Sequence, residues 1–347
     1  MLGVNVFLTG GTGFIGLRLV TSLIQQGMRV TALVRNPSHS HALELEQLGA
    51  TLVKGDVTMR ESMRLAMQQA DVVIHGAGVY QLGLDKAGIE RMNAVNIEGT
   101  KNTLGLAHEL GVKHAIYLST TWAYGASASS VARDETAIRS VTYATDYERT
   151  KKEAHRIALE FGTAGLPLTI LCPNAVIGEN DHASFGYTLR MYLCNVLPPI
   201  AWTPQVRLSL VHLDDLISAI MLTVQKKPIG QTYFIGGEAH TRSEMFTYWQ
   251  KHAGGLKFRA WLPVEFTKMI FTPLEPLQRA IGLPAVFSRE LVEAGRISLY
   301  DSSERAKRDL GWTHRSAATM WDDTIAAERL LLAKRAKRDL ISLLKPI

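Results

Sequence analysis

Short apolar runs alternate with longer amphipathic stretches along the first half of the chain. The runs are rich in β-branched residues, as strands are, whereas the stretches between them repeat their apolar positions at helical spacing. Strands are therefore expected at residues 4–9, 29–34, 51–54, 72–75, 114–119 and 168–171. Strands that alternate with helices form parallel sheets covered on both faces, so the pattern predicts an α/β fold with a doubly wound parallel sheet.

The regular alternation ends near residue 172, and loop-forming pairs such as Pro198-Pro199 follow it. A chain of 347 residues is long enough for a main domain and a smaller attached one. Two later segments, residues 208–213 and 231–237, have the pattern of strands that return to the first domain. The expected division is a first domain over residues 1–172, joined again by 206–237, and a smaller, mainly helical C-terminal domain over residues 173–205 and 238–347.

A glycine-rich turn joins the first expected strand to the first expected helix, at residues 9–16. In this spacing Gly10 permits the turn, Gly13 lets the backbone approach a diphosphate, and Gly16 allows the helix to pack closely on the strand. The free N–H groups and the dipole at the helix start favour an anion there. The turn therefore predicts a dinucleotide site in which the glycines act together with Thr12, Phe14 and Ile15.

The residue after the second strand bears on which dinucleotide is bound. An NAD site normally places an acidic residue about 20 positions after the glycine motif, where it binds the ribose 2′-hydroxyl. No acidic residue lies between Gly16 and Glu44, and Arg35 stands at the strand end instead. Because a guanidinium pairs well with a 2′-phosphate, the expected cofactor is NADP(H); the alternative is that Arg35 is a surface residue.

Two further strand ends are expected to contribute to the cofactor site, and a helix follows them. Asp56, followed by Val57, either accepts a hydrogen bond from the adenine amino group or begins a turn. Ala77 and Gly78 are small enough for the backbone to lie along the cofactor. A helix is expected from residue 93 to residue 110.

Tyr147 and Lys151 are the candidate catalytic pair. They lie four residues apart in a helical stretch and so share one helix face. A phenol with a pKa of about 10 is a poor acid–base catalyst at neutral pH, but a neighbouring ammonium group stabilises the phenolate and lowers that pKa. A strand end rich in hydroxyl groups, residues 119–121, precedes the pair.

With these residues the sequence resembles the extended short-chain dehydrogenase/reductase family over nearly its whole length. The resemblance rests on the glycine motif, Asp56, Asn96-x-x-Gly99-Thr100, Ser119-Thr120, Tyr147/Lys151, Pro173-Asn174, and residues 211–215 and 306–312. It implies a Rossmann fold, with Thr120 as the catalytic hydroxyl, or Thr121 as the alternative, and with Asn96 supporting the cofactor or a proton-relay water. It also adds Ser119, Pro173, Asn174 and Val176 to the cofactor-binding residues, beside Tyr147 and Lys151.

Two positions indicate the branch of the family. Nucleotide-sugar dehydratases carry an Asp-Glu pair after the catalytic hydroxyl, where this chain has Thr121-Trp122. Nucleotide-sugar epimerases carry a diphosphate-binding arginine at the position of Leu208; Arg207 is adjacent, but it points to the opposite face of a strand. The pattern looks more like the dihydroflavonol reductase-like branch, although Cys172 departs from an arginine that is common there.

The resemblance implies an NADPH-dependent reductase of a ketone or aldehyde, reversible as an alcohol dehydrogenase. The alternatives are a sugar or nucleotide-sugar epimerase and a non-catalytic NADP-binding sensor or assembly factor. Residues 182–210 and 256–290 are expected to line the substrate pocket, and their apolar residues favour a small, apolar substrate, although core packing explains much of the same composition. These apolar residues are Phe185, Tyr187, Met191, Tyr192, Trp202, Trp261, Phe266, Met269, Ile270 and Phe271.

Composition adds a few bounds. Hydrophobic residues make up 46% and charged residues 20%, which is ordinary for a soluble globular protein, and no signal peptide or membrane-spanning run is apparent. Cys172 and Cys194 have no metal-ligand spacing, and no nucleic-acid motif is present. A cytoplasmic homodimer is expected. The net charge of +6 is concentrated near residues 330–345, a basic helical segment that either docks on the protein or contacts a membrane surface.

Overall fold

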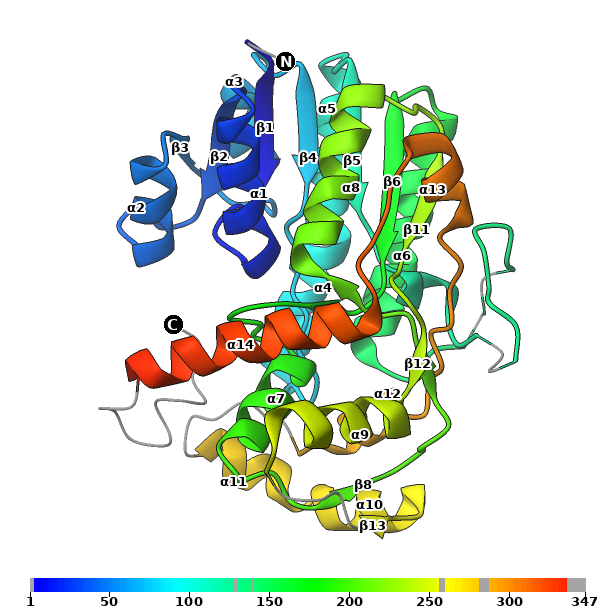
Figure 1. The fold of residues 1–347 in the computed structure, drawn as a ribbon. Helices are drawn as coiled ribbons and strands as arrows, with labels where there is room; N and C mark the ends of the chain where they lie inside the picture. The colour runs from blue at the N-terminus through cyan, green and yellow to red at the C-terminus, as the bar shows by residue number, and fades with distance from the viewer. Residues whose placement is uncertain are drawn as a thin grey trace.

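A parallel sheet forms the centre of the computed structural model, which describes residues 3–127, 130–138, 140, 142–255, 260–280 and 287–335. Within these residues the sheet has seven strands in the order β11-β6-β5-β4-β1-β2-β3 (Figure 1). The strands are β1 (Asn5–Thr9), β2 (Arg29–Val34), β3 (Thr51–Lys54), β4 (Val72–His75), β5 (His114–Leu118), β6 (Leu168–Pro173) and β11 (Thr232–Ile235). The order reverses between β1 and β4, the point at which doubly wound sheets bind ligands. The predicted α/β fold is confirmed.

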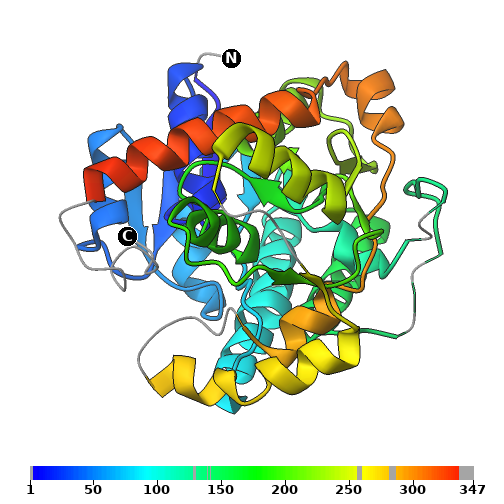
Figure 2. The ribbon, with the colours of Figure 1, turned by 60° about the horizontal axis from the view of Figure 1, so that its bottom comes forward.

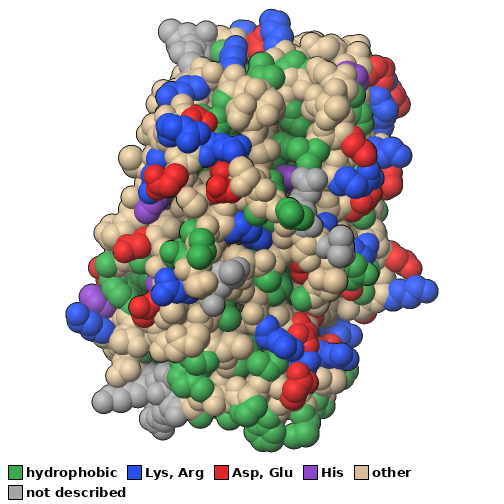
Figure 3. Space-filling model, turned by 90° about the vertical axis from the view of Figure 1, so that its right-hand side faces the viewer, with side chains coloured by type: hydrophobic (Ala, Val, Ile, Leu, Met, Phe, Trp, Pro, Cys, Tyr) green, Lys and Arg blue, Asp and Glu red, His purple; other side chains and the backbone are tan. Residues whose placement is uncertain are grey.

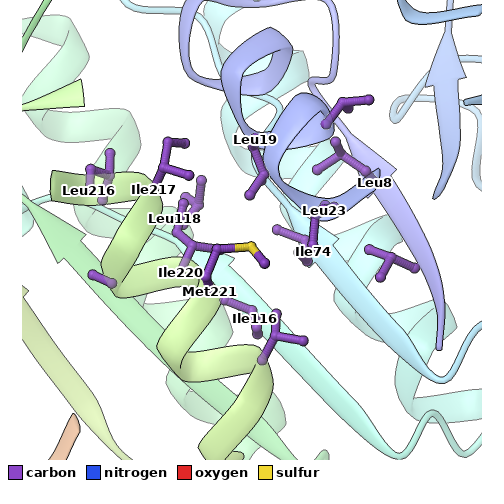
Figure 4. Close-up of a cluster of buried hydrophobic side chains, with 14 of the residues drawn as sticks. Leu8, Leu19, Leu23, Ile74, Ile116, Leu118, Leu216, Ile217, Ile220 and Met221 are labelled. Carbon is purple, nitrogen blue, oxygen red and sulfur yellow. The ribbon is translucent and has the colours of Figure 1, made fainter. Parts of the chain in front are cut away.

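Helices cover both faces of the sheet and bury a separate apolar core on each. One core lies under four helices: α1 (Phe14–Gln25), α2 (Ser40–Gln47), α8 (Leu213–Lys226) and α13 (Glu304–Leu310). Figure 4 shows part of it, where Leu19 and Leu23 of α1 and Ile220 of α8 meet Ile74 and Ile116 of the sheet. The other core lies under α3 (Arg64–Met67), α5 (Gly99–Glu109) and α6 (Asp146–Thr163).

The helix expected over residues 93–110 begins earlier and is interrupted. It starts with α4 (Lys86–Asn93), where the Asp85 side chain accepts a hydrogen bond from the Gly88 backbone N–H at 2.8 Å. A π-helical segment, Ala94–Glu98, then leads into α5. The expected start at residue 93 was therefore wrong, because Asp85 caps the helix one residue before Lys86.

The second part of the chain packs around its own aromatic core, beside the carboxyl ends of the strands (Figures 1 and 2). Trp249 and Trp321 are both buried there, with their ring centres 5.1 Å apart. Its helices are α7 (Ser184–Leu193), α9 (Arg242–Ala253), α10 (Val264–Phe271), α11 (Leu274–Ala280), α12 (Arg289–Ala294) and α14 (Ala317–Arg335). Its strands are β7 (Val176–Ile177), β8 (Ile200–Ala201), β9 (Arg207–Leu208), β10 (Val211–His212), β12 (His240–Thr241) and β13 (Ala260–Trp261).

The two late segments expected to be strands differ in outcome. Residues 232–235 form β11, which pairs with β6 in the central sheet. Residues 208–213 do not form one strand, because β9 pairs with β12 whereas β10 pairs with β7. Between β9 and β10, the Ser209 hydroxyl donates to the Asp301 carbonyl oxygen, and the Ser209 backbone N–H donates to the Leu299 carbonyl oxygen. These bonds to a distant segment interrupt the expected strand.

The described part of the chain ends in α14, which packs against α9 through Met320, Trp321 and Ile325. The expected basic segment continues to residue 345, but residues 336–347 lie outside the described residues. No helix in the described ranges is both long and apolar enough to cross a membrane.

Apolar side chains gather at the lower end of the face in Figure 3, where β13, α10 and α11 lie in Figure 1.

A buried ion pair between α7 and α14 yields a stability prediction. Arg190 donates to Glu328 at 2.9 Å, and their side chains are 2% and 0% exposed. Removing one partner leaves an uncompensated buried charge, so Arg190→Met should lower the free energy of unfolding by about 3–5 kcal/mol. The exposed Arg156, which pairs with Glu153 and Glu160, provides the control: Arg156→Met should cost less than about 1 kcal/mol. Urea unfolding measures both, and equal losses would contradict the prediction.

Candidate active site

A cavity of about 740 Å³ extends from the glycine turn, past the carboxyl ends of the strands, into the second part of the chain. Every residue predicted from the sequence for the cofactor site lines it, and so do Thr120, Tyr147 and Lys151. Asn96 is the exception among the predicted site residues. The structure therefore brings residues from widely separated segments together around one space.

The glycine turn has the shape that a dinucleotide cradle requires. Gly10 has a φ of +82°, and a Cβ there would lie 2.7 Å from the Ala77 backbone nitrogen. A Cβ on Gly16 would lie 2.1 Å from the Gly10 carbonyl oxygen. Helix α1 begins after Gly13 without a side-chain cap and has no acidic residue in its first turn. Its first N–H groups are thus available to a diphosphate, and this geometry fits a nicotinamide dinucleotide.

Arg35 and Asp56 lie at the same end of the cavity as the turn. The Arg35 side chain is exposed and has no ion pair or hydrogen bond with any described residue. Asp56 begins a turn, because its Oδ1 accepts hydrogen bonds from the backbone N–H and the hydroxyl of Thr58, both at 2.9 Å. Because the Arg35 guanidinium has no described partner, it is available to a ligand.

Helix α6 carries Tyr147 and Lys151 into the middle of the cavity. The Lys151 Nζ donates to the Leu118 carbonyl oxygen at 3.1 Å and to the Tyr117 hydroxyl at 3.3 Å. Burial lowers the pKa of Lys151. Burial also raises the pKa of Tyr147 to about 12, although the charge of Lys151 and the hydroxyl of Thr120 act in the opposite direction. The phenol is therefore protonated at neutral pH in the protein alone.

Thr120, rather than Thr121, lines the cavity. Its hydroxyl donates to the Pro173 carbonyl oxygen at 3.2 Å and accepts from the Trp122 backbone N–H at 3.3 Å. Thr121 is fully buried, and its carbonyl oxygen accepts from Arg133 at 3.1 Å. Of the two candidate hydroxyls, Thr120 is the one that can reach a ligand.

Asn96 lies behind the cavity and holds two of its walls together. Its Oδ1 accepts from the Val79 backbone N–H at 2.7 Å, and its Nδ2 donates to the Val79 carbonyl oxygen and to the Thr150 hydroxyl, both at 3.0 Å. Val79 belongs to the loop after β4, and Thr150 precedes Lys151 on α6. In this structure the amide of Asn96 connects the loop to α6.

His75 also holds the loop after β4 in place, through hydrogen bonds to threonine hydroxyls. The Thr100 hydroxyl donates to the Asn96 carbonyl oxygen at 2.7 Å, so it accepts from His75 Nε2 at 3.0 Å. His75 Nδ1 then accepts from the Thr9 hydroxyl at 2.8 Å, and that oxygen accepts from the Ala77 N–H at 3.2 Å. Burial, and secondly the charge of Lys151, lower the pKa of His75 to about 3. This neutral histidine supports the structure and does not line the cavity.

Two supporting residues escaped the sequence analysis. His155, one turn after Lys151 on α6, hydrogen-bonds to the Ser119 hydroxyl through Nδ1 at 2.8 Å; its four-residue spacing from Lys151 could have revealed it. Glu290 of α12 accepts from the backbone N–H groups of Gly83 at 2.7 Å and Asp146 at 2.8 Å. It thereby connects the second part of the chain to the start of α6. No local pattern indicates a contact between residues 144 positions apart.

With this geometry in view, the sequence was compared with known proteins. The sequence model of the NAD dependent epimerase/dehydratase family matches residues 6–236. The chain belongs to this family. The extended short-chain dehydrogenase/reductase resemblance is thereby confirmed, and members of the family bind a nicotinamide dinucleotide. The relatives in this family are named as oxidoreductases, among other activities, so the protein is an enzyme of the oxidoreductase type.

Two of the family relatives are similar over most of their length. Sterol demethylase protein B of Methylococcus capsulatus is 25% identical over 93% of this chain and 97% of its own. The 4-hydroxy-2-methyl-3-oxo-4-farnesyl-3,4-dihydroquinoline-1-oxide ketoreductase of Stigmatella aurantiaca is 24% identical over 90% of this chain and 92% of its own. These relatives span nearly the whole chain, so the likeness includes its second part.

A solved structure of the family shows the same fold. The UDP-glucose 4-epimerase of Thermotoga maritima, in complex with UDP-glucose, superimposes with a TM-score of 0.77. It is 21% identical and covers 95% of this chain and 100% of its own. At this identity the likeness establishes the arrangement of sheet and helices and leaves the substrate open.

The close approach at Gly16 predicts a loss of nucleotide binding. Gly16→Ala places a Cβ against backbone atoms, which must shift, so we expect NADP⁺ affinity to fall at least about tenfold. Gly162→Ala in α6 is the matched control, because its Cβ would lie 3.8 Å from the nearest atom, the Leu168 side chain. Calorimetric titration with NADP⁺ measures both variants. Unchanged affinity in Gly16→Ala would mean that the turn does not hold the nucleotide.

Proposed function

We propose that this protein is an NADPH-dependent reductase that converts the ketone or aldehyde of a small, largely apolar substrate into an alcohol, reversibly. The observation that carries the proposal is the meeting of Thr120, Tyr147 and Lys151 in one cavity. The glycine cradle forms one end of this cavity, and the apolar second part of the chain forms the other. Such a cavity can hold a dinucleotide and a carbonyl compound side by side.

Apart from the hydride, which the cofactor supplies, the chemistry is carried out by residues of the chain. NADPH, when bound, supplies the hydride that reaches the carbonyl carbon. The Thr120 hydroxyl, which now donates to the Pro173 carbonyl oxygen, can turn its proton to the carbonyl oxygen of the substrate. Tyr147 then gives its phenolic proton to that oxygen as the alkoxide forms. The buried Lys151 ammonium stabilises the phenolate that remains on Tyr147, because opposite charges interact strongly away from water.

The second part of the chain supplies an apolar, aromatic wall. Trp202 and Phe271 contact edge to face, with ring centres 5.6 Å apart, and Phe287 packs on Phe271 at 5.2 Å. Ile297 and Leu299 line the same space. This wall favours an apolar substrate, and the names of the two relatives, which mention a sterol and a farnesyl group, support the same class.

Against the epimerase alternative, this chain lacks a diphosphate-binding arginine on β9. Leu208 faces the cavity and is 4% exposed. Arg207 is exposed on the other side, where its guanidinium lies over the Tyr300 ring at 5.3 Å. Against a dehydratase, this chain lacks an acidic pair after Thr120. The retained Tyr147 and Lys151 argue against a sensor that has lost catalysis.

We infer that the cofactor is NADP(H) rather than NAD(H), because Arg35 is available where an NAD site would carry an acidic residue. A cytoplasmic homodimer remains the expectation from the sequence.

Removing the phenol tests the catalytic assignment. Tyr147→Phe should lower kcat about 10²–10⁴-fold, since positioned acid catalysis contributes that much. NADPH affinity should stay within about twofold, because the cradle is unchanged. Tyr143→Phe is the control, since Tyr143 is exposed and outside the cavity. Turnover is measured as NADPH consumption with a panel of apolar ketones. Near wild-type turnover in Tyr147→Phe would remove this residue from the mechanism.

The cofactor assignment is tested at Arg35. Charge-assisted hydrogen bonds contribute about 1.5–3 kcal/mol, so wild type should prefer NADPH over NADH by roughly ten- to over a hundredfold in kcat/KM. Arg35→Asp should reverse the preference, because it repels the 2′-phosphate and offers the 2′-hydroxyl an acceptor. Lys54→Asp, on the neighbouring β3 and outside the cavity, controls for the general change of charge. A wild-type preference for NADH would refute the assignment.

A further inference from the structure

Arg242 lines the substrate half of the cavity, although neither the glycine motif nor the catalytic residues involve it. It is the first residue of α9, and its backbone N–H donates to the Val206 carbonyl oxygen at 3.0 Å. This contact places it directly after the β9–β12 pair that contains Leu208. Its side chain is partly exposed, and since it lines the cavity, part of that exposed surface faces the cavity.

Only one nitrogen of the Arg242 guanidinium is engaged by the described residues. Its Nη1 donates to the Trp202 carbonyl oxygen at 2.7 Å and to the Thr203 hydroxyl, and the group lies over the Trp202 ring at 5.5 Å. A guanidinium has five N–H donors, so the three on Nε and Nη2 have no described acceptor. The Nε–Nη2 edge is one that binds the two oxygens of a carboxylate in parallel.

No described carboxylate compensates the charge of Arg242. Two other arginines of this region, whose side chains are 2% and 8% exposed, are paired: Arg190 with Glu328 and Arg133 with Asp301. Burial alone shifts the pKa of Arg242, lowering it to about 10, and no neighbouring charge contributes. The group is therefore a cation at neutral pH, placed among aromatic and aliphatic side chains where an unpaired charge is costly.

A purely structural role accounts for only part of this arrangement. The hydrogen bonds of Nη1 hold residues 202 and 203 against the start of α9. These bonds require one donor nitrogen, and they leave unexplained why a charged group faces an apolar cavity with its bidentate edge free. An anionic ligand would supply the missing partner.

We propose that Arg242 binds the carboxylate of the substrate, which is thus an apolar carbonyl compound with an anionic headgroup. This inference rests on the proposed reductase function and narrows its substrate class. The aromatic wall around Trp202 would hold the apolar body, and Arg242 would fix the end of that body relative to Tyr147.

A sugar nucleotide carries the same kind of charge, but the lining favours a carboxylate on an apolar body. In the second part of the chain, the polar side chains that line the cavity, among them Asp181, His182 and Ser184, are outnumbered by apolar ones, which offer no hydrogen bonds to sugar hydroxyls or a nucleobase. The apolar ones include Ile200, Leu208, Met245, Phe246, Ile297 and Leu299. A single guanidinium edge also matches one carboxylate, whereas a diphosphate carries two charged groups.

Calorimetry on NADP⁺-loaded protein tests the proposal without turnover. The probes are dodecanoate, dodecan-1-ol and UDP-glucose. Wild type should bind dodecanoate at least about tenfold more tightly than dodecan-1-ol, because the two share one apolar body and differ in the charged headgroup. Arg242→Met should remove this difference while leaving dodecan-1-ol affinity within about twofold, and Arg242→Lys should keep part of it. Arg207→Met, on the outer face of β9, should bind as wild type does.

The outcomes separate this proposal from its rivals. If dodecanoate and dodecan-1-ol lose affinity equally in Arg242→Met, the arginine only shapes the pocket and the proposal is wrong. Binding of UDP-glucose that disappears in Arg242→Met would also overturn it, in favour of a nucleotide ligand. Because binding is measured directly, Arg242-dependent binding of dodecanoate without reduction of any ketone would refute the reductase function and leave the anion site standing. If the protein reduces ketones but shows no preference for a keto acid over its methyl ester, the carboxylate site is refuted and the reductase function stands.

Discussion

The buried ammonium group of Lys151 is the constraint on which the site depends. It has no carboxylate partner among the described residues, and it contacts the Leu118 carbonyl oxygen and the Tyr117 hydroxyl and ring. An unpaired cation in such a place favours loss of its proton, and the pKa of Lys151 is lowered accordingly. The same imbalance makes a negative charge on Tyr147 favourable, which is what proton transfer from the phenol requires. A carboxylate beside Lys151 would stabilise the fold and remove this effect.

Contacts with the surrounding structure hold α6, which carries Tyr147 and Lys151, in place. At its start, Thr145 caps α6 through the Glu148 N–H at 3.0 Å, and Glu290 accepts from Asp146. Farther along, Thr150 is tied to Asn96, and His155 to Ser119 at the end of β5. These contacts come from four different segments of the chain. They fix the position and rotation of the helix, so that Tyr147 and Lys151 both face the cavity.

The second part of the chain is joined to the sheet beside the ends of β5 and β6. Arg133 pairs with Asp301 at 2.8 Å and also donates to the carbonyl oxygens of Gly125 and Thr121. Asn174, at the end of β6, donates to Asp301 and to the Leu299 carbonyl oxygen, both at 2.9 Å. The aromatic wall of the substrate half is therefore held in a fixed relation to Thr120. Arg242 belongs to that wall and, like Lys151, has no carboxylate partner among the described residues.

The features that depend on local chemistry could be predicted from the order of the amino acids alone. The β-branched runs specified the bounds of the central strands closely, because strand periodicity is written in consecutive residues. The glycine turn and the Tyr147–Lys151 pair were recognisable because their spacing alone sets a shape or a shared helix face. The features that could not be predicted depend on contacts between distant segments of the folded chain. Ser209 divides an expected strand because residues 299 and 301 bind it.

The expected pocket residues show the same limit. Phe185, Trp202 and Phe271 do line the cavity. Tyr187, Met191 and Tyr192 are buried elsewhere in the second part of the chain, while Trp261, Phe266 and Met269 are exposed. All are apolar, and composition cannot distinguish a side chain that lines a cavity from one that fills a core. The free edge of Arg242 likewise became visible only in the folded chain, where no described carboxylate pairs with it.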